Sequence, residues 1–308
     1  MSLNKIFNRT RCQALPILVA FILACTFVIS LWAQESLHSN SNKNFLWSVE
    51  TGTTTVYLLG SLHVMRSDAW PLAQEIESAY NDCKKVVFET DVDGMNGTAA
   101  QAKVMTLGLY PEGQTLEQNI SGETYRLLHE KATARGLPMA YLVHYKPWLC
   151  ALTLTVMEFQ RLGFDLRHGI DNYFFRKAKA DGKETIFLET VEHQLNLFAQ
   201  LDVSEQESFL GQTLKDLEVI ETLASDMVVA WKTGNVDKLS SMITISFKEY
   251  PDIYDRLFVQ RNKEWATQID YLTKRNGNVL VVVGAGHLVG TEGLVELLKK
   301  KGYTVKQR

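Results

Sequence analysis

The segment VYLLGSLHVM, residues 56–65, leads from a buried strand through a glycine turn to a histidine. Its apolar, strand-forming residues end at a glycine, and His63 stands three positions later. The segment VLVVVGAGHLVG, residues 279–290, repeats this order with Gly284 and His287. Glycine lets the backbone turn sharply off a strand, and neutral imidazole is the commonest metal ligand among side chains. The repeated Gly-x-x-His pattern therefore predicts that both histidines belong to one site.

Each segment opens a β-turn-α-β unit, one near each end of the chain. The predicted elements are strands at 55–59 and 86–89 around a helix at 69–82, and strands at 279–283 and 303–307 around a helix at 291–301. Parallel βαβ units place the loops after their strands at one edge of the sheet, where ligands usually bind. His63 and His287 are therefore expected to meet at that edge. Asp68 is expected to cap the first helix.

The sequence between the two units, roughly residues 98–250, is mostly helical in pattern. One further strand is predicted at TIFLET, residues 185–190. No linker interrupts residues 45–308, which predicts one α/β domain. Its central sheet is expected to be mixed or mostly parallel, built from the two β-turn-α-β units with a large helical insertion.

Residues 1–33 have the composition of an export segment. Basic residues precede an apolar run from Ala14 to Ala33, and no acidic residue occurs before Glu35. This pattern predicts a signal peptide or, because the run is long enough to cross a bilayer, an N-terminal membrane anchor. Residues 34–44 are polar and are predicted to form a tether. The remaining chain is expected in the periplasm or another extracytoplasmic space, either soluble after signal cleavage or tethered.

Composition limits the classes of partner. The chain has 308 residues, of which 46% are hydrophobic and 22% charged, with a formal net charge of −3. No block of basic residues occurs, so a nucleic-acid partner is not expected. Cys83 and Cys150 are the two cysteines outside the export segment. They could pair in an oxidising compartment or stay free, and no zinc-type cysteine cluster exists.

Acidic residues follow two of the predicted strands. Glu89 and Asp91 end the segment VVFETD, and Glu189 ends another strand in the same way. Two imidazoles and one carboxylate form an open metal site of the hydrolytic type, in which bound water loses its proton near neutral pH. A spare carboxylate can take that proton. The alternative for Glu89 is a helix cap or an ion pair, and for Glu189 an acidic residue at a helix start.

Several other sites are disfavoured. The third glycine of segment 284–290 is one place late for a dinucleotide-binding loop, and no acidic residue ends the next strand. HEKAT at 129–133 lacks the second histidine of the zinc motif HExxH, and no Gly-x-Ser-x-Gly elbow of a serine hydrolase occurs. The remaining predictions are surface positions for His144, His168 and His193, and core positions for Trp148 and Trp265.

Six stretches together carry a resemblance to a known family. They are FLWSVETGTTTVYLLGSLHVM at 45–65, VVFETD at 86–91, KPWLCAL at 146–152, GIDNYFFRKAKADGKETIFLETVEHQL at 169–195, RN at 261–262 and VLVVVGAGHLVG at 279–290. In this order they resemble the TraB/PrgY/GumN family, whose animal relatives include the TIKI proteases. The resemblance implies a metal-dependent hydrolase fold related to the erythromycin-esterase and ChaN-like group.

The resemblance also implies the residues of an active centre. In TIKI-type members the two Gly-x-x-His motifs and the glutamate between them form it, which correspond here to His63, His287 and Glu89. Manganese or cobalt supports peptide-bond cleavage in those members, and Zn²⁺ is a further candidate. Arg261 and Asn262 match the late polar pair of the family, and could bind a developing oxyanion or orient a carboxylate.

The sequence therefore predicts an exported metal-dependent hydrolase, a peptidase acting on a peptide or protein substrate. His63, His287 and Glu89 are the expected metal ligands. The expected catalytic residues are Glu89, Arg261, Asn262 and Glu189. The alternative is a non-catalytic extracytoplasmic protein that sequesters a signal peptide or a haem-like ligand in the same cleft. A third reading is a membrane-tethered scaffold whose histidines serve only the fold.

Overall fold

The computed structural model of the chain describes residues 43–308. The predicted export segment and all but the last two residues of the predicted tether lie outside these described residues. None of the helices within 43–308 is long and apolar enough to cross a membrane. The described chain forms two compact units. The helical unit contains residues 91–166 and 190–220, and the sheet unit contains 43–90, 167–189 and 221–308.

The sheet unit is built on six strands. They are β1 (Leu46–Glu50), β2 (Thr55–Ser61), β3 (Lys85–Phe88), β4 (Glu184–Phe187), β5 (Val279–Gly284) and β6 (Val305–Gln307). Their order is β4-β3-β5-β2-β1-β6. The first four strands of this order pair in parallel, and β1 pairs antiparallel with both β2 and β6. The predicted mostly parallel α/β sheet is therefore confirmed.

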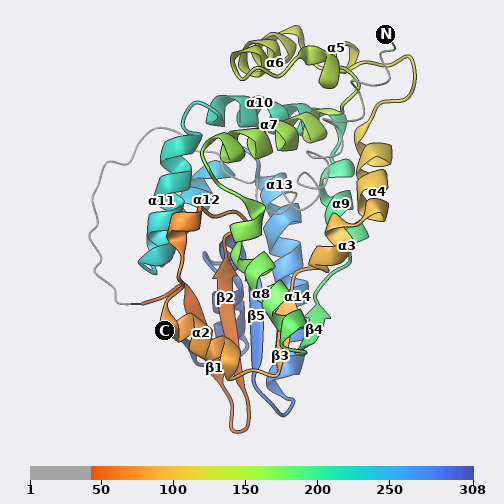
Figure 1. The fold of residues 1–308 in the computed structure, drawn as a ribbon. Coiled ribbons are helices and arrows are strands. Elements are labelled where there is room, and N and C mark those ends of the chain that lie inside the picture. The colour runs from red at the N-terminus through yellow and green to blue at the C-terminus, as the bar shows by residue number, and fades with distance from the viewer. Residues whose placement is uncertain (1–42) are drawn as a thin grey trace. The chain divides into compact units, whose positions relative to one another are not determined.

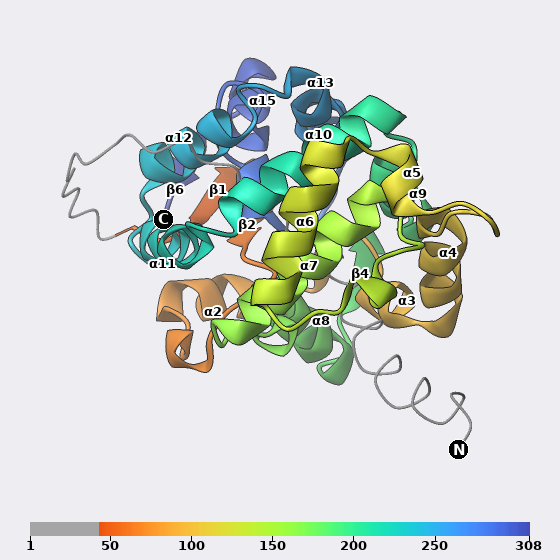
Figure 2. The same ribbon diagram turned by 90° about the horizontal axis from the view of Figure 1, so that it is seen from above.

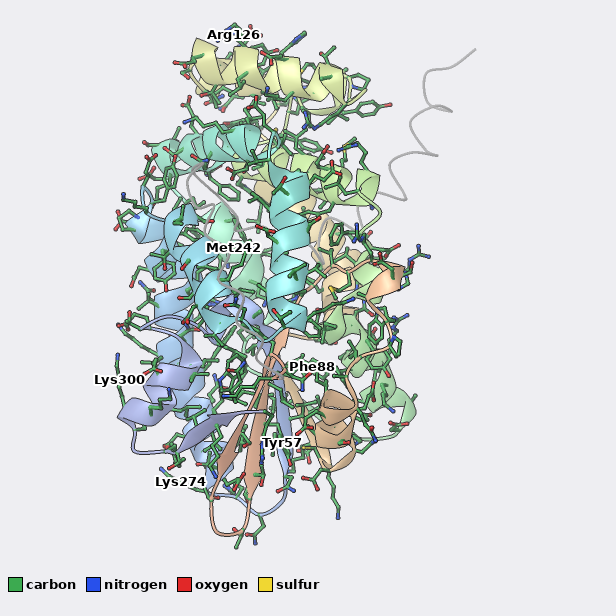
Figure 3. All side chains as sticks on the ribbon, turned by 90° about the vertical axis from the view of Figure 1, so that its left-hand side faces the viewer. Tyr57, Phe88, Arg126, Met242, Lys274 and Lys300 are labelled. Carbon is green, nitrogen blue, oxygen red and sulfur yellow. The ribbon has the colours of Figure 1, made fainter. Side chains whose placement is uncertain are left out.

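The central strands explain why the two ends of the chain meet. Every residue of β5 is buried, as expected for a Val-rich strand with neighbours on both sides and helices on both faces. In Figure 1 the early, orange strand β2 lies beside the late, blue strand β5. Their register pairs Gly60 with Val283 and Ser61 with Gly284. Phe88, the buried last residue of β3, is opposite Val282 (Figure 3).

Helices cover both faces of this sheet. In the views of Figures 1 and 2, α2 (Gln74–Asn81) and α8 (Ile170–Ala180) lie on one face, and α14 (Gln260–Thr273) and α15 (Leu294–Lys300) lie on the other. The other helical elements assigned to this unit are η3 (Ser67–Ala69), α11 (Ile220–Lys232), α12 (Val236–Ser246), α13 (Pro251–Tyr254), the π-helical turn η6 (Asp255–Val259) and η7 (Ala285–His287).

The first predicted helix is wrong at its start. Asp68 does not cap it but lies inside the short 3₁₀ turn η3, and α2 begins only at Gln74 with Ala73 as its N-cap. The reason is Pro71, which has no backbone N–H to donate and disfavours the helical conformation of the residue before it. Strands β1 and β2 form a hairpin, in which Glu50 pairs with Thr55.

The helical unit has no strand among its described residues. Its helices are α3 (Val92–Asn96), α4 (Thr98–Gly108), α5 (Leu116–Asn119), α6 (Gly122–Ala134), η4 (Met139–Tyr141), α7 (Pro147–Arg161), α9 (Val191–Ala199) and α10 (Val203–Asp216), and the turn η5 (Leu166–His168) joins it to the sheet unit. Helix α7 supplies much of its core, and Trp148 stacks on Phe198. The predicted core position of Trp148 is confirmed.

The two cysteines within the described residues are free thiols. Cys83 lies in the sheet unit and Cys150 in the helical unit, and both are buried. Burial raises the pKa of the Cys83 thiol to about 12 and also raises the pKa of Cys150. Both thiols are therefore in the neutral, weakly nucleophilic form near pH 7.

A buried ion pair in the helical unit predicts a pH-dependent stability. The Glu158 carboxylate accepts hydrogen bonds from Arg135 and Arg161. Burial favours its neutral form, but these bonds outweigh burial and lower its pKa. Glu158→Gln should therefore cost about 2 kcal/mol of unfolding free energy near neutral pH. That cost should shrink as the pH falls from the ordinary glutamate pKa through the lowered folded one, because the wild type then loses the charge as well.

Urea unfolding of both proteins near pH 7 and near pH 3 measures this difference. The control is Glu218→Gln, in which an exposed carboxylate that bonds Lys131 is replaced. Its cost should be much smaller, because water and salt screen an exposed ion pair. Equal costs for the two substitutions would contradict the prediction.

Candidate functional site

The carboxyl ends of the parallel strands gather the predicted residues of the sheet unit. His63 follows β2 by two residues, and His287 ends η7 directly after β5. Glu89 follows β3, and Glu189 follows β4 by two residues. The Glu189 backbone N–H donates to the Glu89 carbonyl, 2.9 Å away, which ties these two strand ends together. All four side chains are more than nine-tenths buried.

One carboxylate oxygen lies between the two histidines. Glu89 Oε1 is 3.9 Å from His63 Nε2 and 4.0 Å from His287 Nε2. The same oxygen accepts a hydrogen bond from the Gly284 backbone N–H at 2.6 Å. A Cβ at Gly284 would lie 3.0 Å from His63 Nε2 and 3.2 Å from Glu89 Oε1. The glycine is thus required here for space, since its φ of −51° suits other residues as well.

Arg261 is the buried cation of the site. Its Nη2 donates to Glu89 Oε2 at 3.0 Å and to Glu189 Oε1 at 2.6 Å, and its Nε donates to Glu189 Oε2 at 3.0 Å. Its Nη1 lies 3.1 Å from His287 Nε2. One guanidinium therefore links two carboxylates and an imidazole, as its planar array of donors allows.

A π-helical turn places Arg261. In η6 the Gln260 backbone N–H donates to the Asp255 carbonyl, five residues back instead of four. Within this turn, the Leu257 carbonyl accepts a bond from Arg261 Nη1 at 2.8 Å. The Trp265 ring packs against both the guanidinium and the His287 ring. Such single π turns often occur at functional sites.

His287 is held in one neutral form. Its Nδ1 lies 2.6 Å from Asn262 Oδ1, and Asn262 Nδ2 donates to the Glu292 carbonyl, so the Asn262 oxygen must accept. Arginine can only donate, so Nε2 is the unprotonated nitrogen. Burial lowers the pKa of His287 well below its usual value, and Arg261 lowers it further. His287 therefore presents an Nε2 lone pair to the site.

His63 lies near two carboxylates, those of Asp171 and Glu89. Its Nδ1 is 3.2 Å from Asp171 Oδ2, although the two atoms are not aligned as a hydrogen bond. Burial alone would lower the pKa of His63, but Asp171 and Glu89 outweigh burial and raise it. Burial also raises the pKa of Glu89, and Arg261 opposes this effect.

The buried cluster holds more negative than positive groups. The carboxyl groups of Glu89, Glu189 and the partly exposed Asp171 outnumber the single guanidinium of Arg261. Buried charge is stable only when it is paired or bound to a metal. A cluster with more carboxyl groups than guanidinium groups can take up protons or a divalent cation.

The structure brings together all six residues predicted for the site, namely His63, Glu89, Glu189, Arg261, Asn262 and His287. Asp91 lies in the helical unit, where it is the N-cap of α3 and its side chain accepts the Asp93 N–H. His144 and His193 are exposed, as predicted, and His168 is partly exposed. Trp265 is buried as predicted but also contacts the site.

Asp171 is the residue that the sequence prediction missed. It occupies the first turn of α8, where an acidic side chain is ordinary because it favours the helix dipole. Its only sequence signal is the Gly-Ile-Asp triplet at the helix start. No spacing rule connects that triplet with His63, more than 100 residues earlier, and only the packing of α8 on the sheet does so.

Comparison with known proteins identifies the family. The model of the TraB/PrgY/gumN family matches residues 45–307. The chain belongs to this family. The Escherichia coli (strain K12) protein YbaP is 26% identical over 248 residues, which cover 80% of this chain and 89% of YbaP. No solved structure matches the chain.

Two animal proteins are also similar to the chain. Metalloprotease TIKI2 of Xenopus tropicalis is 24% identical over 328 residues, which cover 89% of this chain. Metalloprotease TIKI2 of Danio rerio is 23% identical over 319 residues, which cover 85% of this chain. The chain spans 60% of the length of each of these two relatives.

The metal that such relatives suggest can be tested against the donor atoms. Within residues 43–308 no group of three or more imidazole, thiol or carboxyl side chains is already arranged around a metal position. The donor types nevertheless fit one, because two imidazole nitrogens lie within 4.0 Å of a single carboxylate oxygen. The surplus of carboxyl groups over the single guanidinium also favours a bound cation.

Gly284→Ala tests whether the space beside the histidines matters. The new methyl group should push His63 and Glu89 apart and lower the unfolding free energy by about 1–3 kcal/mol. Chemical denaturation measures this loss. In the control Gly211→Ala, the methyl group meets no atom within 4 Å in helix α10, so the stability should rise by about 0.5–1 kcal/mol. An unchanged stability of Gly284→Ala would contradict the claim that His63 and Glu89 pack too closely on Gly284 for a side chain there.

Arg261→Met tests the buried cation. It leaves two carboxylates facing each other without a counter-charge and should cost about 3–5 kcal/mol near neutral pH. Without the guanidinium, the pKa of Glu89 should rise further above its usual value. The cost should therefore shrink as the pH falls and Glu89 becomes protonated. Denaturation at several pH values measures this trend.

The matched control is Arg126→Met, at an exposed position on α6 (Figure 3). It should change the stability by no more than about 0.5 kcal/mol at any of these pH values. An Arg261→Met cost that stays constant or grows on acidification would contradict the assigned charges.

Proposed function

We propose that the chain is a metal-dependent hydrolase that cleaves a peptide or protein substrate. One observation carries the proposal: His63, His287 and Glu89 converge in a buried cluster, with two imidazole nitrogens within 4.0 Å of one carboxylate oxygen. Two relatives that are named metalloproteases support it. Because the chain spans 60% of their length, their activity applies here only as a hypothesis.

His63 and His287 would hold the metal, and Glu89 would be either the third ligand or the general base. Bound Mn²⁺, Co²⁺ or Zn²⁺ would supply a water molecule of lowered pKa and an electrophile for the scissile carbonyl. His287 suits the ligand role because its Nδ1–H is fixed on Asn262 and its Nε2 lone pair faces the cluster. For that role, Arg261 Nη1 must release His287 Nε2.

Arg261 would stay on the two glutamates when it releases His287. From that position its positive charge can stabilise the oxyanion that develops on the substrate. Glu189 would fix the direction of the guanidinium, with which it forms two hydrogen bonds. Asn262 would act through His287 and not on the substrate, because its oxygen faces His287 and its NH2 donates to the Glu292 carbonyl.

Two further parts of the proposal rest on the sequence. One is export to the periplasm or another extracytoplasmic space through residues 1–33, with the mature chain soluble or tethered. The other is the relation of the fold to the erythromycin-esterase and ChaN-like group. The arrangement of helices on both faces of a mostly parallel sheet, with the candidate site at its carboxyl edge, is compatible with that relation.

The test is metal binding followed by hydrolysis. The purified chain should be stripped of metal and titrated with Mn²⁺ and with Co²⁺ by calorimetry, with elemental analysis of the product. We expect about one ion per chain. His63→Ala and His287→Ala should each lose about 100-fold or more of the affinity, since a direct ligand matters at least as much as an outer partner. His144→Ala is the exposed histidine control and should bind normally.

The loaded proteins are then compared for cleavage of a mixed peptide library by mass spectrometry. Cleavage by the wild type and not by either histidine variant would establish the hydrolase. Metal binding without any cleavage would favour the alternative, a binding protein that sequesters a signal peptide or a haem-like ligand. Equal metal content in the folded wild type and both variants would refute the metal site.

A further inference from the structure

Helix α8 is fastened to the loop that carries His63. The Ile170 backbone N–H donates to the Leu62 carbonyl at 3.1 Å. The Asp171 backbone N–H donates to Ser61 Oγ at 3.1 Å, and the Ser61 hydroxyl donates to Asp171 Oδ1 at 2.9 Å. Ser61 ends β2, opposite Gly284. These three bonds fix the start of α8 on the residues just before the histidine.

The hydrogen bonds between Ser61 and Asp171 leave one carboxylate oxygen of Asp171 for His63. Oδ1 of Asp171 is used by Ser61, whereas Oδ2 lies 3.2 Å from His63 Nδ1. That nitrogen is fully buried and has no aligned hydrogen bond among the described residues. A buried imidazole N–H without an acceptor is destabilising. A slight rotation of the ring or the carboxylate toward each other would form the bond.

The second histidine offers a comparison. His287 Nδ1 faces an oxygen of Asn262, and its Nε2 faces Glu89. His63 has the same order, with an oxygen of Asp171 at Nδ1 and Glu89 at Nε2. An outer oxygen of this kind fixes the tautomer and ring orientation of a metal-binding histidine. An acidic residue that served only the dipole of α8 would need neither the reciprocal Ser61 bonds nor the position beside His63.

We propose that Asp171 is a positioning residue that keeps a proton on His63 Nδ1 and thereby directs Nε2 toward Glu89. Asp171 makes no contact with the substrate in this role and acts only through His63. The proposal deepens the function proposed above, because metal binding by His63 needs a bare Nε2. The protonation of Nδ1 itself is a property of the metal-free protein and does not depend on that function.

The first test is ¹⁵N NMR of the metal-free protein with labelled histidine, in which the His63 signals are assigned by their loss in His63→Ala. In the wild type, Nδ1 should carry a proton throughout the pH range in which the protein is folded. In Asp171→Asn the Ser61 hydroxyl, which donates to Oδ1 of residue 171, should hold the amide oxygen. The amide N–H then faces the ring, unlike that of Asn262, so a share of His63 should change to the form protonated only at Nε2. The control is Asp181→Asn, at the other end of α8, where the carboxylate accepts a hydroxyl bond from Tyr80. It should leave the His63 signals unchanged.

The second test is titration of the same proteins with Co²⁺. Asp171→Asn should weaken binding by roughly 10–100-fold, and Asp181→Asn should not. If the wild type binds no Co²⁺, the proposed function fails, while the NMR result still decides the role of Asp171. An unchanged His63 tautomer in folded Asp171→Asn overturns the inference.

Ser61→Ala provides a second variant if Asp171→Asn does not fold. It removes the hydroxyl that fixes Asp171 and keeps the carboxylate. A smaller shift of the His63 tautomer in the same direction supports the inference. An unchanged tautomer in Ser61→Ala then overturns it.

Discussion

The ion pairing of Arg261 with Glu89 and Glu189 is the interaction on which the carboxyl edge of the sheet depends. Glu89 follows strand β3 and Glu189 follows strand β4 by two residues, and the guanidinium bonds both. Without a buried cation, two neighbouring carboxylates that are both buried could not both stay ionised. The guanidinium therefore allows the strands to bring acidic groups together in the interior. Burial lowers the pKa of His287, and the same positive charge lowers it further.

The rest of the edge is arranged around this pairing in two layers. The inner layer consists of groups that face one another, the two histidines and Glu89. The outer layer consists of groups that face the Nδ1 atoms of the histidines, Asn262 at His287 and Asp171 at His63. Such outer contacts hold the inner groups in orientations that suit chemistry. The glycine at the end of β5 supplies the space between them.

The two histidines are alike in sequence but not in environment. Both follow a Gly-x-x pattern after a buried strand, and both direct Nε2 toward the same oxygen. His63 lies between two carboxylates, which raise its pKa although burial opposes them. His287 lies beside Asn262 and a permanent positive charge, with aromatic rings packed on it. Neighbours from distant parts of the chain create this difference, and the two similar motifs give no sign of it.

The sequence alone determined the α/β class, the parallel strands and the two histidine turns, because apolar runs and glycines are local signals. It also indicated the acidic residues at strand ends, since such positions share one edge of a parallel sheet. Tertiary structure decided which groups touch. The π-helical turn that aims Arg261 inward and the packing of α8 that brings Asp171 to His63 have no local signal. A mid-helix arginine and a helix-start aspartate look ordinary in sequence, and only the elements packed against them determine what they do.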